Sequence, residues 1–247
     1  MYNYKSKEKS RKIKYIDLAG VTVITCTRRH HSLHNVIENY KRQEQKIKEL
    51  IIILHDNSMD PNIWREALNE QDHVRIIQLD ENISLGKCLN FAAAHAAFNI
   101  IAKFDDDDYY GPKYLSDSIK FFYEVDADVI GKLTSYVYFQ KEKILAIRHM
   151  GNENSYVKRI DGPSIIFKKS VLSKVKFRDI SRGEDNWFCK DCLEHSIKIF
   201  SINRFHHIYM RHANKEDHTW TIENEKLLKM CRIVSTGEID YEKYIDC

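Results

Sequence analysis

The sequence has little glycine and proline and no long apolar run. Its 247 residues include 8 glycines and 3 prolines, so flexible linkers are scarce and we expect one compact domain. No apolar stretch approaches the roughly 20 residues of a membrane-spanning helix, and no signal peptide is recognisable. The 6 cysteines form no disulfide framework. We therefore expect free thiols and a cytoplasmic protein.

An excess of charge of one sign is also missing. Lys and Arg number 39 against 36 Asp and Glu, a net charge of +3, which is too small to predict a nucleic-acid-binding protein. The exception is a basic leader over residues 1–19, which we expect to be flexible. Such a segment can contact anionic lipid, so one expectation is a peripheral association with the inner face of the membrane.

Glycine-rich phosphate loops are absent as well. The pattern GxGxxG does not occur, and Gly86-Lys87 lacks the first glycine of a Walker motif because Glu81 stands at that position. A nucleotide bound by this chain would therefore need its diphosphate held by a metal ion in place of a backbone cradle.

The most informative segment that is present runs from residue 100 to residue 112, IIAKFDDDDYYGP. A short apolar strand leads into four consecutive carboxylates, Asp105 to Asp108, which repel one another. A divalent cation would offset this repulsion, because carboxylate oxygens are preferred ligands of Mg²⁺, Mn²⁺ and Ca²⁺. A solvated acidic turn is the alternative, which the apolar strand disfavours. An EF-hand calcium loop is disfavoured because Tyr110 stands where a ligand is needed.

Strands and helices are expected to alternate through the first half of the chain, since short apolar runs are separated by segments with helical periodicity. The expected strands are residues 21–25, 50–54, 74–78 and 100–104. One helix is expected from residue 32, and two more over residues 63–68 and 85–97. This alternation predicts an α/β fold with a doubly wound sheet. Such sheets bind ligands at the carboxyl ends of their strands. The polar clusters at those ends are residues 25–28, 55–60 and 105–108.

The second half of the chain predicts further, shorter strands and helices. The expected strands are residues 128–131, 135–139, 144–148, 164–167, 197–201 and 205–209. Three helices are expected. One starts at residue 169, one runs from RGEDNWF to about residue 194, and one lies around residues 227–230. The second and third of these strands should form a hairpin. Cys189 and Cys192 fall within a predicted helix, so we expect structural thiols and not a metal or redox pair.

Five segments in order carry a resemblance to a known family. They are VTVITCTRR, LHDNSMD, Asn82-x3-Gly86 with Asn90, AKFDDDDYYGP and GEDNWF. Over residues 20–215 the chain resembles the inverting glycosyltransferases of family 2, in their bacterial polysaccharide and spore-coat branch. The resemblance implies a GT-A fold, in which a Rossmann-like nucleotide-binding sheet with helices on both faces merges with a smaller acceptor-side mixed sheet. The implied divisions are a nucleotide-sugar half over 20–112, an acceptor half over 113–215, and a C-terminal helical tail over 216–247.

The resemblance also implies which residues meet the donor and a metal ion. The implied donor contacts are Thr25, Arg28, Asp56, Asn82, Lys87, Asp105 and Asp106. Asp107 would ligate Mn²⁺ or Mg²⁺, with Asp105 and His212 as further candidate ligands. Because the four acids are consecutive, the family motif could be aligned one residue earlier or later on them. His55 replaces an acid that the family usually has, so the nucleobase stays open and a UDP-sugar is the first expectation. Asp56 could instead be an acid that caps the following helix.

Asp185 in GEDNWF matches the general base of the family, and Glu184 beside it is the fallback. Both acids could instead complement the dipole of a helix N-terminus. Trp187 could stack on an acceptor sugar or lie in the core. Residues 161–163, Asp-Gly-Pro, resemble an acceptor-side loop.

The resemblance therefore implies a metal-dependent inverting glycosyltransferase. It would move a sugar from a nucleoside-diphosphate sugar to a hydroxyl of a glycan, a lipid-linked sugar or a protein, in glycan or cell-surface polysaccharide biosynthesis. A nucleotidyltransferase shares the α/β sheet and paired acids, but it normally has a glycine- and arginine-rich loop that CTRRHHSLH lacks. The other alternative is a degenerate relative that binds a nucleotide or a glycan without turnover.

Overall fold

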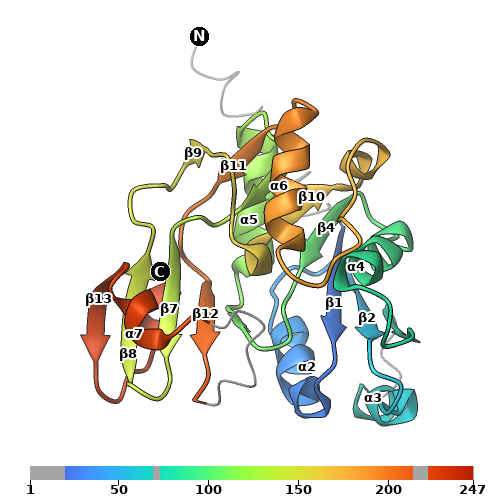
Figure 1. The fold of residues 1–247 in the computed structure, drawn as a ribbon, viewed down its shortest axis with the longest axis horizontal. Coiled ribbons are helices and arrows are strands. Elements are labelled where there is room, and N and C mark those ends of the chain that lie inside the picture. Colours follow the sequence, from blue (N-terminus) through green and yellow to red (C-terminus); the bar gives the residue numbers. More distant parts are fainter. Residues whose placement is uncertain (1–19, 69–72, 214–221, 247) are drawn as a thin grey trace, which may run out of the picture.

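The computed structural model describes residues 20–68, 73–213 and 222–246, which form two β-sheets with helices packed around them (Figure 1). The larger sheet has eight strands in the order β3-β2-β1-β4-β10-β6-β11-β9. Its strands are β1 (Val21–Thr27), β2 (Lys48–Leu54), β3 (Val74–Gln78), β4 (Ile100–Lys103), β6 (Val129–Gly131), β9 (Ser155–Tyr156), β10 (Ile166–Lys168) and β11 (Ile199–Ser201). The predicted basic leader, residues 1–19, lies outside the described residues, so its contact with a membrane stays a prediction.

The helices are short and lie mainly between strands of the larger sheet. They are α2 (Leu33–Lys41), α3 (Pro61–Ala67), α4 (Leu85–Ala94), α5 (Tyr114–Glu124), α6 (Glu184–Glu194), α7 (Asn224–Leu228) and α8 (Glu242–Ile245). Three 3₁₀ helices are η1 (His30–Ser32), η2 (Gly162–Ser164) and η3 (Lys169–Ser173). Within the described ranges, no helix is long and apolar enough to cross a membrane.

The first four strands of the larger sheet are parallel, as the alternation of elements predicts. β1 pairs with β2 on one side and β4 on the other, so that Val21 lies opposite both Lys48 and Ile100, and β3 continues the sheet beyond β2. β10 then runs antiparallel to both β4 and β6, which makes the sheet mixed. The α/β prediction is confirmed, with a parallel first half and a mixed second half.

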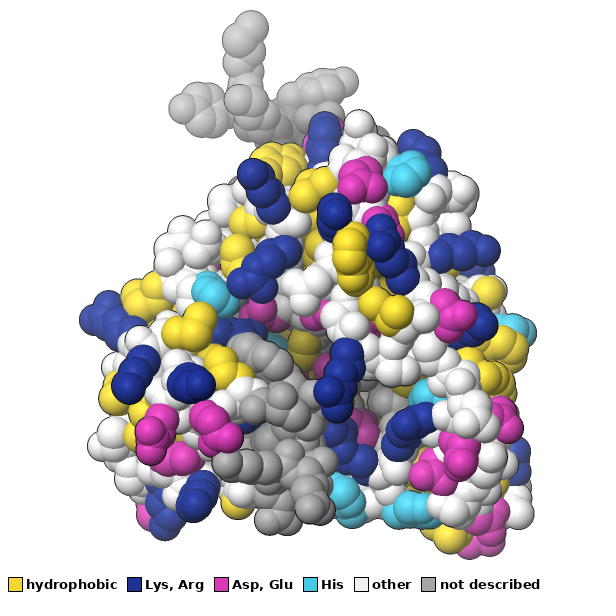
Figure 2. Space-filling model, in the orientation of Figure 1, with side chains coloured by type: hydrophobic (Ala, Val, Ile, Leu, Met, Phe, Trp, Pro, Cys, Tyr) yellow, Lys and Arg dark blue, Asp and Glu magenta, His cyan; other side chains and the backbone are white. Residues whose placement is uncertain are grey.

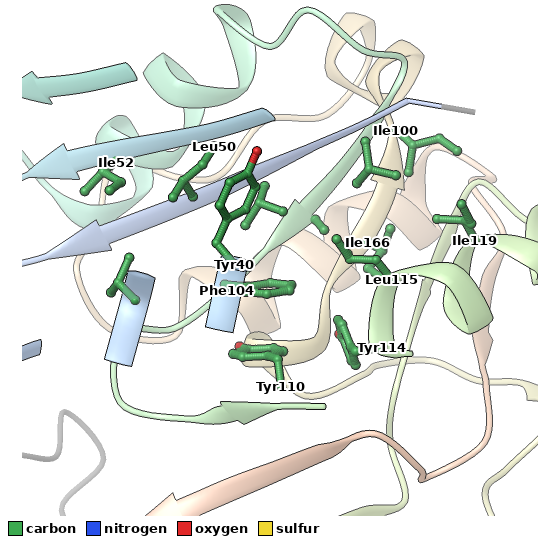
Figure 3. Packing of buried hydrophobic residues seen from close by; sticks show 14 of the residues in the cluster. Tyr40, Leu50, Ile52, Ile100, Phe104, Tyr110, Tyr114, Leu115, Ile119 and Ile166 are labelled. Atoms are coloured by element: carbon green, nitrogen blue, oxygen red, sulfur yellow. The ribbon is translucent and has the colours of Figure 1, made fainter. Parts of the chain in front are cut away.

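Helices cover both faces of this sheet, so its central strands are buried. On one face, Tyr40 of α2 and Leu115 of α5 belong to a core cluster with Leu50 (Figure 3). On the other face, Leu89 of α4 and Phe188 of α6 belong to a second cluster. This double cover explains the continuous apolar sequence of β2. It also holds the carboxyl ends of β1 and β4 in fixed positions.

The smaller sheet has five strands in the order β13-β8-β7-β12-β5. These are β5 (Tyr109–Tyr110), β7 (Ser135–Phe139), β8 (Ile144–Arg148), β12 (His207–Arg211) and β13 (Cys231–Thr236). β7 and β8 form the predicted hairpin. β5 follows the acidic run directly, and Tyr110 stacks on Phe104 with 3.8 Å between ring centroids (Figure 3). The acidic run is therefore one of the connections between the two sheets.

The C-terminal part of the chain differs from its prediction. A helical tail is wrong over residues 231–236, because these residues form β13, which pairs antiparallel with β8. The β-branched residues Ile233, Val234 and Thr236 suit a strand, and β8 otherwise offers an open edge. The helix expected after residue 169 is only the short 3₁₀ helix η3. β12 starts later than predicted because His206 has a φ of 66°, which ends the preceding turn.

A buried histidine fastens the C-terminal segment behind the acidic run. His206 Nε2 lies 3.0 Å from Asp117 Oδ2 on α5, and Nδ1 lies 3.0 Å from Asp246 Oδ1. The His206 backbone nitrogen donates to Ile245, and its carbonyl accepts from Gly111 at 2.8 Å. Three segments far apart in the sequence are thus joined at one side chain.

The Asp117→Asn variant should be less stable at neutral pH. The hydrogen bond from His206 lowers the pKa of Asp117, and Lys120 contributes to this lowering. Because the folded state has the lower pKa, the stabilisation is present at neutral pH and is lost as the pH falls below about 4 through the folded-state pKa. We expect a loss of about 1–3 kcal/mol in the free energy of unfolding at pH 7, shrinking in acid, as measured by urea denaturation.

The exposed carboxylate of Asp126, which pairs with Lys198, provides the matched control. Its side chain is 79% exposed, so Asp126→Asn should change stability little at any pH. Equal losses in the two variants, or a loss in Asp117→Asn that does not depend on pH, would contradict the role given to His206.

Candidate functional site

A cleft of about 820 Å³ opens where β1 and β4 end, and both sheets contribute to its walls. The acidic run lines one part of it, and the loop that leads into α6 lines another. Figure 2 shows many Lys and Arg side chains exposed on one face of the molecule. The cleft therefore lies at the carboxyl ends of the parallel strands, where a doubly wound sheet is expected to bind its ligand.

The four carboxylates of the acidic run have four different surroundings. Asp105 is paired with Lys103. Asp106 accepts a hydrogen bond from Thr27 at 2.5 Å and is paired with Arg29. Asp105, Asp106 and Asp107 all line the cleft, whereas Asp108 does not.

Asp108 is fully buried and serves the fold. Its carboxylate accepts a hydrogen bond from the backbone of Met210 at 2.9 Å and lies 3.2 Å from His207 Nε2. Asn35 and Asn39 donate to its carbonyl oxygen at 3.0 and 2.8 Å. Asp108 therefore fixes the acidic run between α2 and β12.

Asp107 is the carboxylate best placed to hold a cation. Its side chain is 18% exposed, and its Oδ2 lies 3.3 Å from Arg29. Burial raises its pKa well above the usual range, and the carboxylates of Asp106 and Asp108 raise it further. This crowding of like charge is what a bound cation would relieve.

The carboxylates of the cleft suit Mg²⁺ or Mn²⁺ only if a bound nucleotide and water supply the other ligands. Among the described residues, no three His, Cys, Asp or Glu side chains are grouped to hold a metal ion. Mg²⁺ at nucleotide sites commonly takes one or two carboxylates and completes its shell with phosphate oxygens and water. Asp107 and Asp105 fit that shared arrangement. His212 Nε2 lies 2.8 Å from the carbonyl oxygen of Asp107, so it is adjacent to the candidate ligand.

Of the other predicted donor contacts, only Arg28 lines the cleft. It donates from Nε to the carbonyl of His55 at 3.0 Å. The remaining four residues lie outside the cleft lining, and they are Thr25, Asp56, Asn82 and Lys87. Their contact with a donor stays a prediction. Thr27 lies on the same side of β1 as Thr25 and does line the cleft.

Three of those four residues have local polar partners instead. Thr25 is buried. Asp56 accepts hydrogen bonds from the backbone and side chain of Ser58 at 2.8 and 2.6 Å, as a turn-forming acid would. Asn82 donates to Asp80 at 2.8 and 2.9 Å. The ammonium group of Lys87 lies 2.7 Å from Asp179 on the protein surface.

The motif that contains Asn82 has a structural role at its other two positions. The backbone nitrogen of Gly86 donates to Ile180 at 3.1 Å, and a Cβ on Gly86 would lie 1.8 Å from the carbonyl oxygen of Arg178. Asn90 donates to the carbonyl of Phe177 at 2.7 Å and accepts from its nitrogen at 3.0 Å. The motif thus attaches α4 to residues 177–180, which lead toward α6.

The two candidate bases begin α6 and both line the cleft. Glu184 is 7% exposed. Burial raises its pKa, while the nearby Lys103 acts in the opposite direction. Asp185 Oδ1 accepts from the backbone of Asn186 at 2.8 Å. Its other oxygen lies 2.6 Å from where a Cβ on Gly162 would stand, so glycine is needed there.

Trp187 does not line the cleft, although it follows the candidate bases closely. Arg178 lies over its ring at 3.6 Å from the centroid, and Lys190 lies at 4.5 Å. These two cations occupy the ring, so stacking on an acceptor sugar finds no support. Cys189 and Cys192 are buried on the same helix, as structural thiols would be.

Lys103 is the main site residue that the sequence analysis missed. It is 4% exposed on β4 and paired with Asp105. Burial lowers its pKa, but Asp105 and Glu184 outweigh burial, and the pKa lies above the usual range. The available signal was a lysine within an otherwise apolar strand. Lys103 thus connects the acidic run to the candidate bases electrostatically.

Comparison with known proteins gives a family match and similar solved structures. Residues 21–179 match the family described as Glycosyl transferase family 2. No curated protein sequence matches the chain. The crystal structure of S. aureus TarS 1–349 is similar with a TM-score of 0.59 and 17% identity, over 77% of this chain and 60% of that one.

A second TarS 1–349 structure, in complex with UDP-GlcNAc, has a TM-score of 0.62 and 14% identity, over 85% of this chain and 64% of that one. The chain therefore spans less than two thirds of these TarS chains. At such identities the likeness supports the GT-A fold.

Proposed function

The chain belongs to glycosyl transferase family 2, and on that premise we propose that it transfers a sugar from a nucleoside-diphosphate sugar to a hydroxyl acceptor with inversion at the anomeric carbon. The observation that carries the proposal is one cleft lined by both Asp107 and Asp185. The UDP-GlcNAc bound to TarS supports a UDP-sugar as the first donor to test.

The reaction that this cleft suits is a single in-line displacement. Asp185 takes the proton of the acceptor hydroxyl as that oxygen attacks the anomeric carbon. The bond from this carbon to the diphosphate breaks, and its electron pair leaves with the nucleoside diphosphate. A Mn²⁺ or Mg²⁺ ion held by Asp107, with Asp105 and His212 as further candidate ligands, would offset the charge on the leaving group.

Asp185 is favoured over Glu184 as the base because of their surroundings. Glu184 is buried, and the positive charge of the nearby Lys103 acts on it. Asp185 faces Gly162, where the missing side chain leaves the carboxylate room at the cleft wall. Arg29 and Lys103 meanwhile pair with Asp106 and Asp105 and hold the acidic run in place.

The Gly162→Ala variant should impair the base without changing donor binding. The added Cβ would lie 2.6 Å from Asp185 Oδ2 and 3.1 Å from its Cβ, so the side chain must move. We expect the turnover number to fall about 10–100-fold, while nucleotide affinity stays the same. Initial-rate kinetics and calorimetry on the same preparation would measure both.

A double variant controls this experiment. If Gly162→Ala acts through Asp185, adding it to Asp185→Asn should cost nothing further. Losses that simply add would show that Gly162 acts elsewhere.

A thermal-shift panel tests the proposed function. UDP, GDP, dTDP, CDP and ADP would each be added with Mn²⁺ and with EDTA, since a ligand of the folded state raises the melting temperature by mass action. We expect UDP to raise it with Mn²⁺ and not with EDTA. A shift from another nucleotide would change the donor class, and no shift from any nucleotide would contradict a donor site.

A further inference from the structure

Three arginines line the part of the cleft that lies beside Asp185, and the proposed reaction uses none of them. They are Arg148, Arg159 and Arg182. Asp161 is the carboxylate that accompanies them on this wall. The donor half has its own arginines, Arg28 and Arg29, at the end of β1. The cleft therefore has a second basic region, which we call the arginine wall: Arg148, Arg159 and Arg182.

Arg148 and Asp161 form a buried pair that fixes this wall. Arg148 Nη2 lies 2.6 Å from Asp161 Oδ2, with their side chains only 9% and 7% exposed. Ser135 donates to the same oxygen at 2.9 Å. The negative charge of Asp161 is thus matched by Arg148.

Arg159 is held at the cleft but is not closely paired. Its Nη1 lies 4.0 Å from Asp161 Oδ1, and its side chain is 46% exposed. Its Nη2 lies 3.2 Å from His149 Nε2. Burial lowers the pKa of His149. Arg148 and Arg159 lower this pKa further, while Asp161 raises it. Arg159 therefore keeps only a long contact to a carboxylate that Arg148 already holds closely.

Arg182 adds a further positive charge to this wall and stands close to the base in the sequence. It lies three positions before Asp185 in the loop that leads into α6, and it is exposed. It forms no ion pair with any residue of the described ranges. Because Gly162 contacts Asp185 and adjoins Asp161, the arginine wall lies next to the carboxylate that must meet the acceptor.

We propose that the acceptor is anionic. It would carry a phosphate or a carboxylate group, which Arg159 and Arg182 bind while a hydroxyl of the same molecule meets Asp185. The planar guanidinium fork suits both anions, and a bound anion would give Arg159 and Arg182 a close partner in the cleft. This inference rests on the proposed function, since it assigns the acceptor of the same site.

Calorimetry on the full chain, saturated with UDP and Mn²⁺, tests the assignment. The probes are methyl β-D-glucoside, methyl β-D-glucuronide and glucose 6-phosphate, which differ in charge. With UDP in the donor site, the phosphate probe cannot bind there. We expect at least one anionic probe to bind about tenfold more tightly than the neutral one, with a preference that weakens in high salt.

Variants locate the effect. Arg159→Gln and Arg182→Gln should each lower affinity for the anionic probe and leave UDP binding unchanged. Arg65→Gln is the matched control, because Arg65 lies on α3 and contacts Asn62, away from the cleft. It should keep the full preference.

The outcomes separate two kinds of failure. Tighter binding of the glucuronide or of the phosphate supports the proposal and identifies the anion. Equal affinity for all three probes overturns it, as does an anionic preference that survives in the double variant of Arg159 and Arg182. If UDP itself does not bind, the proposed function fails, and the acceptor assignment fails with it.

Discussion

Replacing Asp185 by asparagine is expected to reduce sugar transfer by about 10²–10⁴-fold, the usual contribution of a general base. Asparagine keeps the shape of the side chain but cannot accept the acceptor proton. The proposed nucleotide contacts belong to other segments of the cleft, at the ends of β1 and β4, so nucleotide affinity should be nearly unchanged. Initial rates measure the first effect, and calorimetry with UDP measures the second.

Glu184→Gln is the matched comparison for this variant. Glu184 is a neighbour of Lys103 and buried, so its replacement should lower the free energy of unfolding more than the rate of transfer. Near-normal turnover in Asp185→Asn together with an inactive Glu184→Gln would move the base to Glu184. Full activity in both would remove this helix terminus from the chemistry.

Replacing Asp107 by alanine should abolish the dependence of nucleotide binding on metal. The variant loses a partly exposed carboxylate that lines the cleft. We expect UDP affinity in Mn²⁺ to fall about 10–100-fold, corresponding to about 1.5–3 kcal/mol for a contact to a charged group. UDP titrations with Mn²⁺ and with EDTA would measure the change.

The same titration of Asp105→Asn addresses the register of the acidic run. A larger loss in Asp105→Asn than in Asp107→Ala would make Asp105 the principal ligand. Asp108→Asn is expected to fail differently, by destabilising the fold, because Asp108 is buried against β12. Unchanged UDP affinity in Asp107→Ala, with and without Mn²⁺, would contradict its role as a ligand.

Local periodicity explains why most of the fold could be predicted. β1 to β4 are apolar runs of strand length, and the helices between them have apolar faces, so both signals agree with the tertiary structure. β13 could not be predicted in this way. Its β-branched residues suit a strand, but they do not indicate where that strand pairs. β13 pairs with the open edge of β8, where Cys231 lies opposite Arg148, 83 residues earlier in the chain.

Site residues could be predicted from the sequence where they belong to one short motif. The acidic run and Asp185 stand in recognisable motifs, and the structure brings both to one cleft. Lys103 and the pair of Arg148 with Asp161 arise from tertiary contacts between elements that are separate in the sequence. Asn82 shows the opposite case, since its motif is recognisable but its neighbours Gly86 and Asn90 attach a loop.

The stereochemistry of donor cleavage tests the central claim most directly. With water as the acceptor, ¹H NMR would follow an α-linked UDP-sugar, starting with UDP-GlcNAc, and record which anomer of the free sugar appears first. An inverting displacement at this cleft predicts the β anomer before mutarotation, with Mn²⁺ present and Asp185 intact. Release of the α anomer first, or equal release by Asp185→Asn, would contradict the account.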